Sequence, residues 1–260
     1  MSEFPTRHGT LWVRHFGSGS ARVVALHGFT LHGGMYEQLA GLIGEPLAAP
    51  DLPGHGRSRI EPVTMRTAVD AVADLLATVD PPLLLGYSQG GRVALQVALT
   101  YPERVGSLVV ISTSPGLSGR ARQLRQVADD GLAARIEKIG VVRFLDEWLA
   151  NPLVAPVRAD PDLRDADLEL RLENKAPGIA AALRGLGQAS VSEVTDRLAD
   201  LPMPVVFIAG ALDERYVEFA AAMSIAVGRR PVIVPGVGHN VVLEAPQALA
   251  DVVSDLLRTR

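Results

Sequence analysis

The sequence contains no cysteine among its 260 residues, so disulfide bonds and cysteine-based metal or redox sites are excluded. It also lacks any apolar stretch approaching the roughly 18 residues of a membrane-spanning helix, and we therefore expect no membrane span. The first five residues lack the basic region and the apolar run of a signal peptide, which favours a cytoplasmic protein. The net charge of −4 comes from acidic and basic residues mixed along the chain, which gives no sign of nucleic-acid binding.

Apolar residues are plentiful, at 48%, and suit one globular domain with a large core, as a monomer or homodimer. Strands are predicted at 11–16, 22–26, 46–49, 83–85, 105–111, 205–209 and 231–234. The first two strands are predicted to meet at a hairpin-like turn over 17–20. Helical spacing lies between the strands at 34–43, 65–79 and 93–99, and again at 246–257. This alternation predicts an α/β fold with a mainly parallel sheet and helices on both faces.

The alternation is interrupted between residues 115 and 198, where only helical periodicity and helix-breaking residues occur. We expect this segment, called the cap from here on, to be an α-helical lid. It would be inserted into a core made of residues 1–114 and 199–260.

The most informative motif surrounds Ser88, where Gly86–Gly90 fits the pattern G-x-S-x-G. Three leucines at 83–85 indicate a buried strand before the motif, and helical spacing begins after it at Val93. A strand that turns sharply into a helix is the setting in which this motif exposes a nucleophilic serine. Glycines beside the serine let strand and helix approach without colliding. Ser88 is therefore the candidate nucleophile.

A serine hydroxyl needs a histidine base, and the histidine needs an acid that fixes its tautomer. In this setting the chain order is serine, acid, histidine. His239 is the only histidine after Ser88 and follows the last predicted strand. The acid should follow the strand at 205–209, where Asp213 and Glu214 are the candidates. We favour Asp213, and Glu214 is the alternative, otherwise an exposed charge.

An acyl-transfer site of this kind also needs backbone donors for a developing oxyanion. One is the N–H of the residue after the nucleophile, Gln89, and the other comes from the loop after an earlier strand. His27–Gly28–Phe29 is that loop, so the Phe29 N–H is the second candidate donor. The alternative for His27 and Gly28 is that they only shape a turn.

Arg92 lies four residues after Ser88 and so shares its face of the helix, one turn further on. A planar guanidinium there could bind a substrate carboxylate in bidentate fashion. The alternative is a structural ion pair with a helix neighbour.

These motifs together resemble the α/β-hydrolase-fold superfamily over nearly the whole chain. They are His27–Phe29, Asp51–Ser58, Gly86–Gly90, Asp213 and Gly238–His239, in that family's order. Within the superfamily, the run from Gly86 to Arg92 is similar to that of 2-succinyl-6-hydroxy-2,4-cyclohexadiene-1-carboxylate synthase, a menaquinone-pathway enzyme. The similarity continues at residues 114–117, 144–148, 171–174 and 210–216.

The resemblance implies binding of a small-molecule substrate with several carboxylates. By motif position, the side chains implied are Arg92, Arg122 and Arg171, with Tyr87 and Trp148 lining the pocket. Arg125 could fill the role of Arg122. The implied reaction is a lyase step in which the triad removes a proton and pyruvate leaves, with no cofactor and no metal. One alternative is a carboxylesterase or C–C bond hydrolase that acts on a small ester or ketone through an acyl-serine. Another is a non-enzymatic small-ligand receptor on the same fold.

Overall fold

The computed structural model describes residues 1–150 and 161–259 of the chain. Within these residues a sheet of nine strands runs through the molecule in the order β1-β2-β4-β3-β6-β7-β8-β9, with β5 paired to β2. The strands are β1 Ser2–Thr6, β2 Gly9–Phe16, β3 Val23–Leu26, β4 Leu47–Pro50, β5 Arg59–Ile60, β6 Leu83–Tyr87, β7 Ser107–Ile111, β8 Val205–Gly210 and β9 Val232–Val234. Neighbours from β4 through β3 to β9 are parallel, which confirms the predicted mainly parallel sheet.

The predicted hairpin between β2 and β3 is wrong. Strand β2 pairs antiparallel with β4, whereas β3 lies on the far side of β4 and pairs in parallel with β4 and β6. All four residues of β3 are buried, and such a strand is most stable with covered faces and a neighbour on each edge. The glycine-rich segment at 17–20 therefore leads past β4 to the centre of the sheet. The short strands β1 and β5, which lie beside β2 near the sheet edge, were not predicted, because β1 is largely polar and β5 has only two residues.

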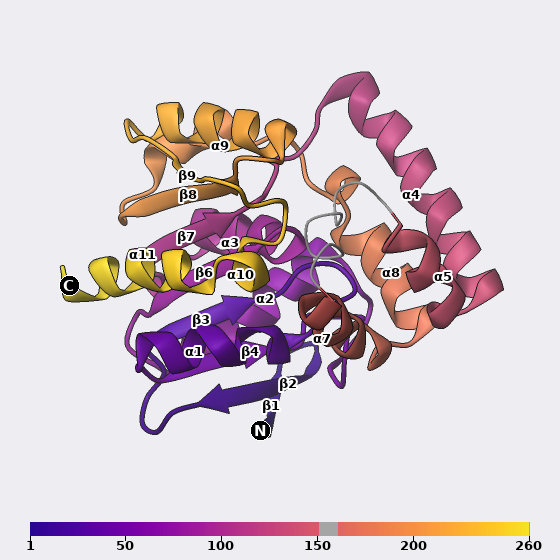
Figure 1. Ribbon diagram of the computed structural model, residues 1–260, viewed down its shortest axis with the longest axis horizontal. Coiled ribbons are helices and arrows are strands. Elements are labelled where there is room, and N and C mark those ends of the chain that lie inside the picture. The colour runs from indigo at the N-terminus through magenta and orange to yellow at the C-terminus, as the bar shows by residue number, and fades with distance from the viewer. Residues whose placement is uncertain (151–160, 260) are drawn as a thin grey trace.

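Helices cover both faces of the sheet, as the alternation predicts (Figure 1). One face carries α1 Glu37–Ile43, α10 Val241–Glu244 and α11 Pro246–Arg258, and the other carries α2 Met65–Leu76, α3 Gln89–Thr100 and α9 Glu214–Ala226. Each face has its own cluster of buried apolar side chains, centred on Tyr36 and Val253 on one side and on Val93 and Met223 on the other. None of the helices in the described part of the chain combines the length and apolarity needed to span a lipid bilayer.

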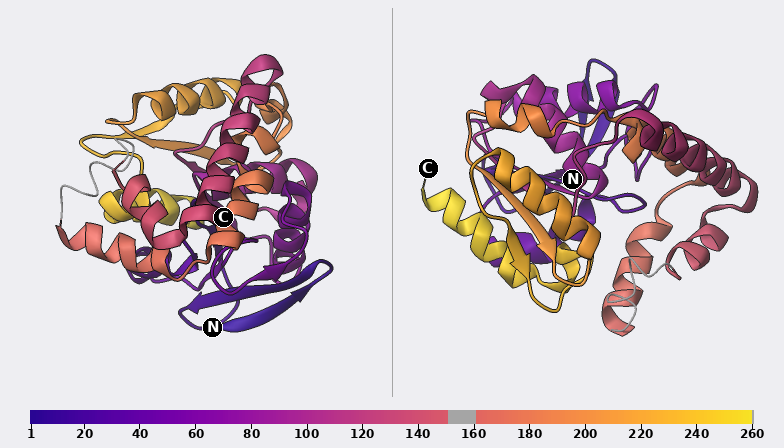
Figure 2. Two further views of the ribbon diagram at one scale, coloured as in Figure 1. Left: turned by 90° about the vertical axis from the view of Figure 1, so that its right-hand side faces the viewer. Right: turned by 90° about the horizontal axis from the view of Figure 1, so that it is seen from above.

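The described residues of the cap add no strand to the sheet. Its helices are α4 Gly119–Ile139, α5 Val141–Trp148, α7 Pro161–Leu172 and α8 Ala176–Leu186, followed by the 3-10 turns η4 Gln188–Ser190 and η5 Thr195–Asp200. Residues 151–160 of the predicted cap lie outside the described residues. The four helices gather on one side of the sheet (Figures 1 and 2). They share a small apolar cluster that includes Ile136, Phe144 and Leu183 and packs against Phe29, which follows the carboxyl end of β3.

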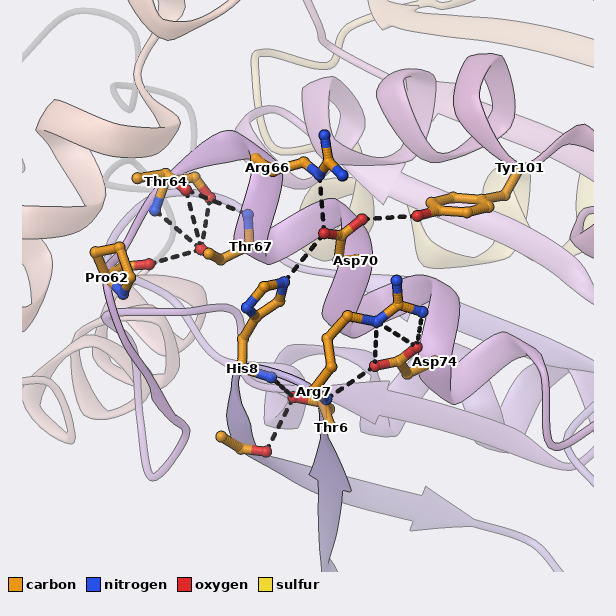
Figure 3. A network of polar contacts seen from close by, with 11 residues as sticks. Thr6, Arg7, His8, Pro62, Thr64, Arg66, Thr67, Asp70, Asp74 and Tyr101 are labelled. Carbon is orange, nitrogen blue, oxygen red and sulfur yellow. Dashed lines mark hydrogen bonds and ion pairs between the residues drawn. The ribbon is translucent and has the colours of Figure 1, made fainter.

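A polar network ties the turn between β1 and β2 to helix α2 (Figure 3). The buried carboxylate of Asp70 accepts hydrogen bonds from Arg66 Nε at 2.9 Å and from the Tyr101 hydroxyl at 2.7 Å, and lies 3.0 Å from His8 Nε2. Burial alone would raise the pKa of Asp70, but its hydrogen bonds to His8, Tyr101 and Arg66 outweigh burial and lower the pKa to about 2. The network lies on the α2 side of the molecule.

Candidate active site

Ser88 occupies a strained turn between β6 and α3. Its backbone angles are φ 52° and ψ −107°, a region that costs a residue with a side chain ~1–3 kcal/mol. The surrounding chain holds this conformation, since the Ser88 N–H donates to the Ile111 carbonyl at 2.8 Å and the Thr113 hydroxyl donates to the Ser88 carbonyl at 3.0 Å. A Cβ on Gly90 would lie 2.2 Å from the Leu26 carbonyl oxygen, so only glycine fits there. The close approach inferred for the motif is thus present.

The structure brings Ser88, His239 and Asp213 together from three separate strand ends. Ser88 Oγ is 3.1 Å from His239 Nε2, and His239 Nδ1 is 2.6 Å from Asp213 Oδ2. A carboxylate on Nδ1 keeps the proton on that nitrogen and leaves Nε2 free to accept the serine proton. Asp213 is buried whereas Glu214 is exposed, so position favours Asp213 as the acid.

Two tyrosine rings pack against the imidazole of His239. The Tyr216 ring meets it edge-on at a centroid distance of 4.5 Å, and Tyr87 lies 5.5 Å away at a tilt. Tyr216 was not predicted as a site residue, although it stands three positions after Asp213, one turn into α9. That spacing could have placed it beside the histidine.

The backbone N–H groups of Phe29 and Gln89 donate to no group in the described part of the chain, and both residues line a cavity above Ser88. Two buried histidines shape the loop that carries Phe29. His27 Nε2 accepts the Leu52 N–H at 2.8 Å, and His55 Nε2 accepts the Thr30 N–H at 3.2 Å.

Accepting at Nε2 requires a neutral imidazole with its proton on Nδ1. Burial is the main reason why the pKa of both histidines is lowered. The pKa of His27 lies well below its usual value, and that of His55 falls to about 4. Both rings are therefore neutral acceptors at neutral pH. The run Asp51–Ser58, singled out as a motif, contributes His55 to this support.

The cavity above Ser88 measures about 360 Å³ and lies between the core and the cap. Its floor carries Ser88, Asp213 and His239, and its apolar wall comes mainly from the cap, with Leu132, Trp148 and Leu183. Tyr87 and Trp148, both implied by the family resemblance, are among its lining residues. Gln188, which sequence reasoning missed, also lines it and donates from Nε2 to the Tyr216 hydroxyl at 3.2 Å.

Four arginines line this cavity: Arg92, Arg125, Arg171 and Arg215. Arg92 is 6% exposed, and its side chain makes one hydrogen bond with the described residues, from Nη2 to the Leu186 carbonyl at 3.1 Å. Its Nε has no partner among the described residues. Burial lowers the pKa of Arg92 to about 10. No carboxylate of the described residues lies within 4.0 Å of this guanidinium. Arg92 therefore forms no ion pair with them, although a structural ion pair was the alternative predicted from the sequence.

The other three cations differ in how their charge is matched. Arg125 donates a hydrogen bond to Asp129 Oδ1 at 2.7 Å, and Arg171 donates two hydrogen bonds to the Asp167 carboxylate, at 2.7 and 2.8 Å. Arg215, an exposed residue that sequence reasoning missed, has no ion-pair partner in the described part of the chain and lies 5.5 Å over the Phe219 ring.

Arg122 is not among the residues that line the cavity. Its guanidinium is bound to the Ala189 carbonyl at 2.7 Å and to the Ser192 hydroxyl at 3.0 Å. Arg125, one helical turn further along α4, lines the cavity instead. Of the two candidates, Arg125 is thus the one that faces the cavity.

Residues 23–252 match the model of the alpha/beta hydrolase family. The chain belongs to this family. A Bacillus subtilis protein provisionally named 2-succinyl-6-hydroxy-2,4-cyclohexadiene-1-carboxylate synthase is 33% identical over 251 residues, covering 92% of this chain and 91% of that protein. The Mycobacterium tuberculosis lipase LipV is 41% identical over 170 residues, 62% of each chain. The solved structure of MenH from S. aureus superposes with a TM-score of 0.88 at 24% identity, covering 96% of this chain and 98% of that one, which shows the shared fold.

Alpha/beta hydrolases place their reacting groups at the carboxyl ends of the parallel strands, where Ser88, Asp213 and His239 lie here. Both the predicted fold and the predicted likeness to the synthases are confirmed by these comparisons. The fold hosts many chemistries, so the choice among them depends on the cavity.

Proposed function

We propose that this protein is a lyase that eliminates pyruvate from an anionic polycarboxylate, as a 2-succinyl-6-hydroxy-2,4-cyclohexadiene-1-carboxylate synthase does. Ser88, activated by His239 and oriented through Asp213, removes a proton from the substrate ring. The ring becomes a diene as pyruvate leaves. The N–H groups of Phe29 and Gln89 hold the charge that develops on a carboxylate or enolate oxygen.

The observation that carries this proposal is the state of Arg92. A buried guanidinium without a counter-ion is costly, and a substrate carboxylate is the partner that would offset the cost. A neutral ester would bring no such partner. The cavity of an ordinary esterase has no need of this charge beside the nucleophile.

The remaining cations support a substrate with more than one carboxylate. Arg125 and Arg171 already have matched charges in Asp129 and Asp167, so each can orient a carboxylate without adding net charge to the cavity. Arg215 is unmatched among the described residues. Two unmatched cations, Arg92 and Arg215, suit a dianionic ligand. The cap would cover this ligand as a lid, with Trp148 and Leu183 over its apolar part.

Hydrolysis of a carboxylic ester is the second candidate, and the similarity to LipV supports it. It would use the same three residues through an acyl-serine intermediate, with the same two N–H donors. It gives no role to the buried charge of Arg92.

The test is to offer the purified protein both substrates. We expect pyruvate release from the menaquinone-pathway intermediate, followed by a coupled NADH assay, to be far faster than release of nitrophenol from short-chain esters. The Ser88→Ala variant should abolish both while its circular dichroism stays that of the wild type. Ester turnover with an acyl-serine adduct in the mass spectrum, and no pyruvate, would establish the hydrolase. Binding of the polycarboxylate with no turnover of either substrate would point to a receptor.

A further inference from the structure

The loop that carries Phe29 contains a residue in an unfavourable conformation. Thr30 has φ 64°, in the left-handed region that β-branched residues avoid. Such a conformation persists only where the surroundings hold it. Thr30 is fully buried, and each of its polar groups has a partner.

Two of the groups that hold Thr30 belong to the cap. Asn174 Nδ2 donates to the Thr30 carbonyl at 2.7 Å, and Arg171 Nη1 donates to the Thr30 hydroxyl oxygen. Arg171 Nη1 also reaches the Phe29 carbonyl at 3.2 Å. From the core, His55 accepts the Thr30 N–H, and the Phe29 carbonyl accepts the Thr30 hydroxyl at 2.6 Å. The peptide that follows Phe29 is thus held by the cap as well as by the core.

Asn174 is suited to this contact because one carboxamide offers a donor and an acceptor together. It is 3% exposed and lies in the bend between α7 and α8. While its Nδ2 binds Thr30, its Oδ1 accepts the Gly56 N–H at 2.8 Å. It therefore joins two core loops, 28–31 and 54–58, to the cap without lining the cavity itself.

The seat of this bend is tightly packed as well as hydrogen-bonded. A Cβ on Gly54 would lie 2.5 Å from the Gly178 carbonyl oxygen at the start of α8. Arg171 is held in a single orientation by its two bonds to Asp167, and both side chains are buried. The contacts on Thr30 therefore come from fixed groups.

We propose that Asn174 is a positioning residue for the oxyanion donor of Phe29, acting with Arg171 to hold Thr30 in its left-handed conformation. The proposal rests on the function given above, because it assigns the Phe29 N–H to the developing oxyanion. It gives Arg171 a role toward the loop in addition to the one toward the substrate. Docking of the α7–α8 bend onto the core loops and formation of the oxyanion site then occur together.

The test compares Asn174→Asp and Asn174→Ala with the wild type. The aspartate keeps an acceptor for Gly56 but loses the donor to Thr30, and the alanine loses both. Because Asn174 does not line the cavity, we expect kcat to fall by about 10- to 100-fold while KM stays within about twofold. This is part of the ~10²–10³-fold loss caused by deleting one oxyanion donor. The affinity of an arylboronic acid, whose adduct with Ser88 places a charged oxygen at the same donors, should fall in parallel.

Hydrogen exchange gives a readout that needs no turnover. Peptides covering residues 28–34 should exchange several-fold faster in both variants than in the wild type. The matched control is Arg184→Ala, which removes an exposed ion pair between α8 and α4 and no hydrogen bond to the described 28–31 loop. It should change neither kcat nor exchange in this peptide.

Folded Asn174 variants with wild-type kcat and wild-type exchange would overturn the proposal. A raised KM with unchanged kcat would also overturn it, because Asn174 would then serve substrate binding. If the wild type turns over neither substrate, the proposed function fails on its own. The exchange experiment still decides the proposal in that case: faster exchange over 28–34 supports the coupling, and unchanged exchange refutes it.

Discussion

We expect the charge of Arg92 to lower the stability of the folded protein and to be essential to the reaction. The Arg92→Met variant tests both expectations. Burial lowers the pKa of Arg92 from its usual value to about 10. At 1.36 kcal/mol per pKa unit, that depression makes the charged side chain ~3 kcal/mol costlier in the folded chain than in the unfolded one at neutral pH. Methionine fills a similar volume without the charge.

The gain in stability should be smaller than that figure, because the Leu186 carbonyl loses its donor when Arg92 is replaced. An unpaired buried acceptor costs ~1–3 kcal/mol, so we expect Arg92→Met to be stabilised by at most about 2 kcal/mol. This corresponds to a rise in Tm of up to roughly 8 °C for a chain of this size. Urea unfolding and a thermal scan of the ligand-free protein measure it.

The loss in turnover should go the other way. A desolvated arginine–carboxylate pair is typically worth ~2–5 kcal/mol when one partner is removed, or about 30- to 5,000-fold in kcat/KM. We expect that loss for the polycarboxylate and less than about threefold for a neutral nitrophenyl ester. Arg135→Met, which removes an exposed ion pair with Glu147 on the cap, is the control and should affect neither substrate.

Two results would refute this reasoning. A lower stability for Arg92→Met would show that the charge is compensated in the ligand-free protein. Equal and small losses on both substrates would show that Arg92 is structural, and ester hydrolysis would then be the better reading of the site.

Three further predictions concern Asp213, Arg125 and Asp70. Asp213→Asn should cut kcat by orders of magnitude through the wrong imidazole tautomer, and Glu214→Gln should not; the reverse result would reassign the acid. Arg125→Met should lower kcat/KM for the polycarboxylate at least about tenfold, whereas Arg122→Met should leave it near wild type, and equal losses would contradict the cavity described here. The pKa of Asp70 is lowered from 3.8 to about 2, so its ionised form stabilises the fold fully above pH 3.8 and less as pH falls toward 2. Asp70→Asn should therefore lose about 2 kcal/mol at pH 7 in urea unfolding, and the difference should shrink between pH 4 and pH 2.

The turn at Ser88 and the positions of His239 and Asp213 could be predicted because their signals are local or ordered along the chain. Gly86–Gly90 encodes its own turn, and the strand and helix beside it are visible in the spacing of apolar residues. His239 followed from being the only histidine after Ser88, and Asp213 from the strand that precedes it. None of these inferences needed to know which strands pair.

Strand pairing, by contrast, is decided by distant residues. Strand β3 could be recognised as a strand, but its buried residues carry no signal that names a partner. Its neighbours, β4 and β6, come later in the chain, and their fully buried apolar residues favour the centre of the sheet just as those of β3 do. A short polar link such as 17–20 suits a hairpin as well as a crossing, so the local sequence favoured the wrong one.

The cap arginines show a different limit. Arg122 and Arg125 are three positions apart on α4, and with the buried residues Asp129, Ala133 and Ile136 they fall on one face of the helix. Periodicity therefore selects the face but cannot choose between the two. What separates them is ~4.5 Å along the helix axis, since each residue adds 1.5 Å. At that spacing Arg122 meets Ala189 and Ser192, while Arg125 meets Gln188 at the edge of the cavity. Which residue faces the cavity depends on how α4 docks against η4, and that is a property of the packed molecule that no stretch of α4 encodes.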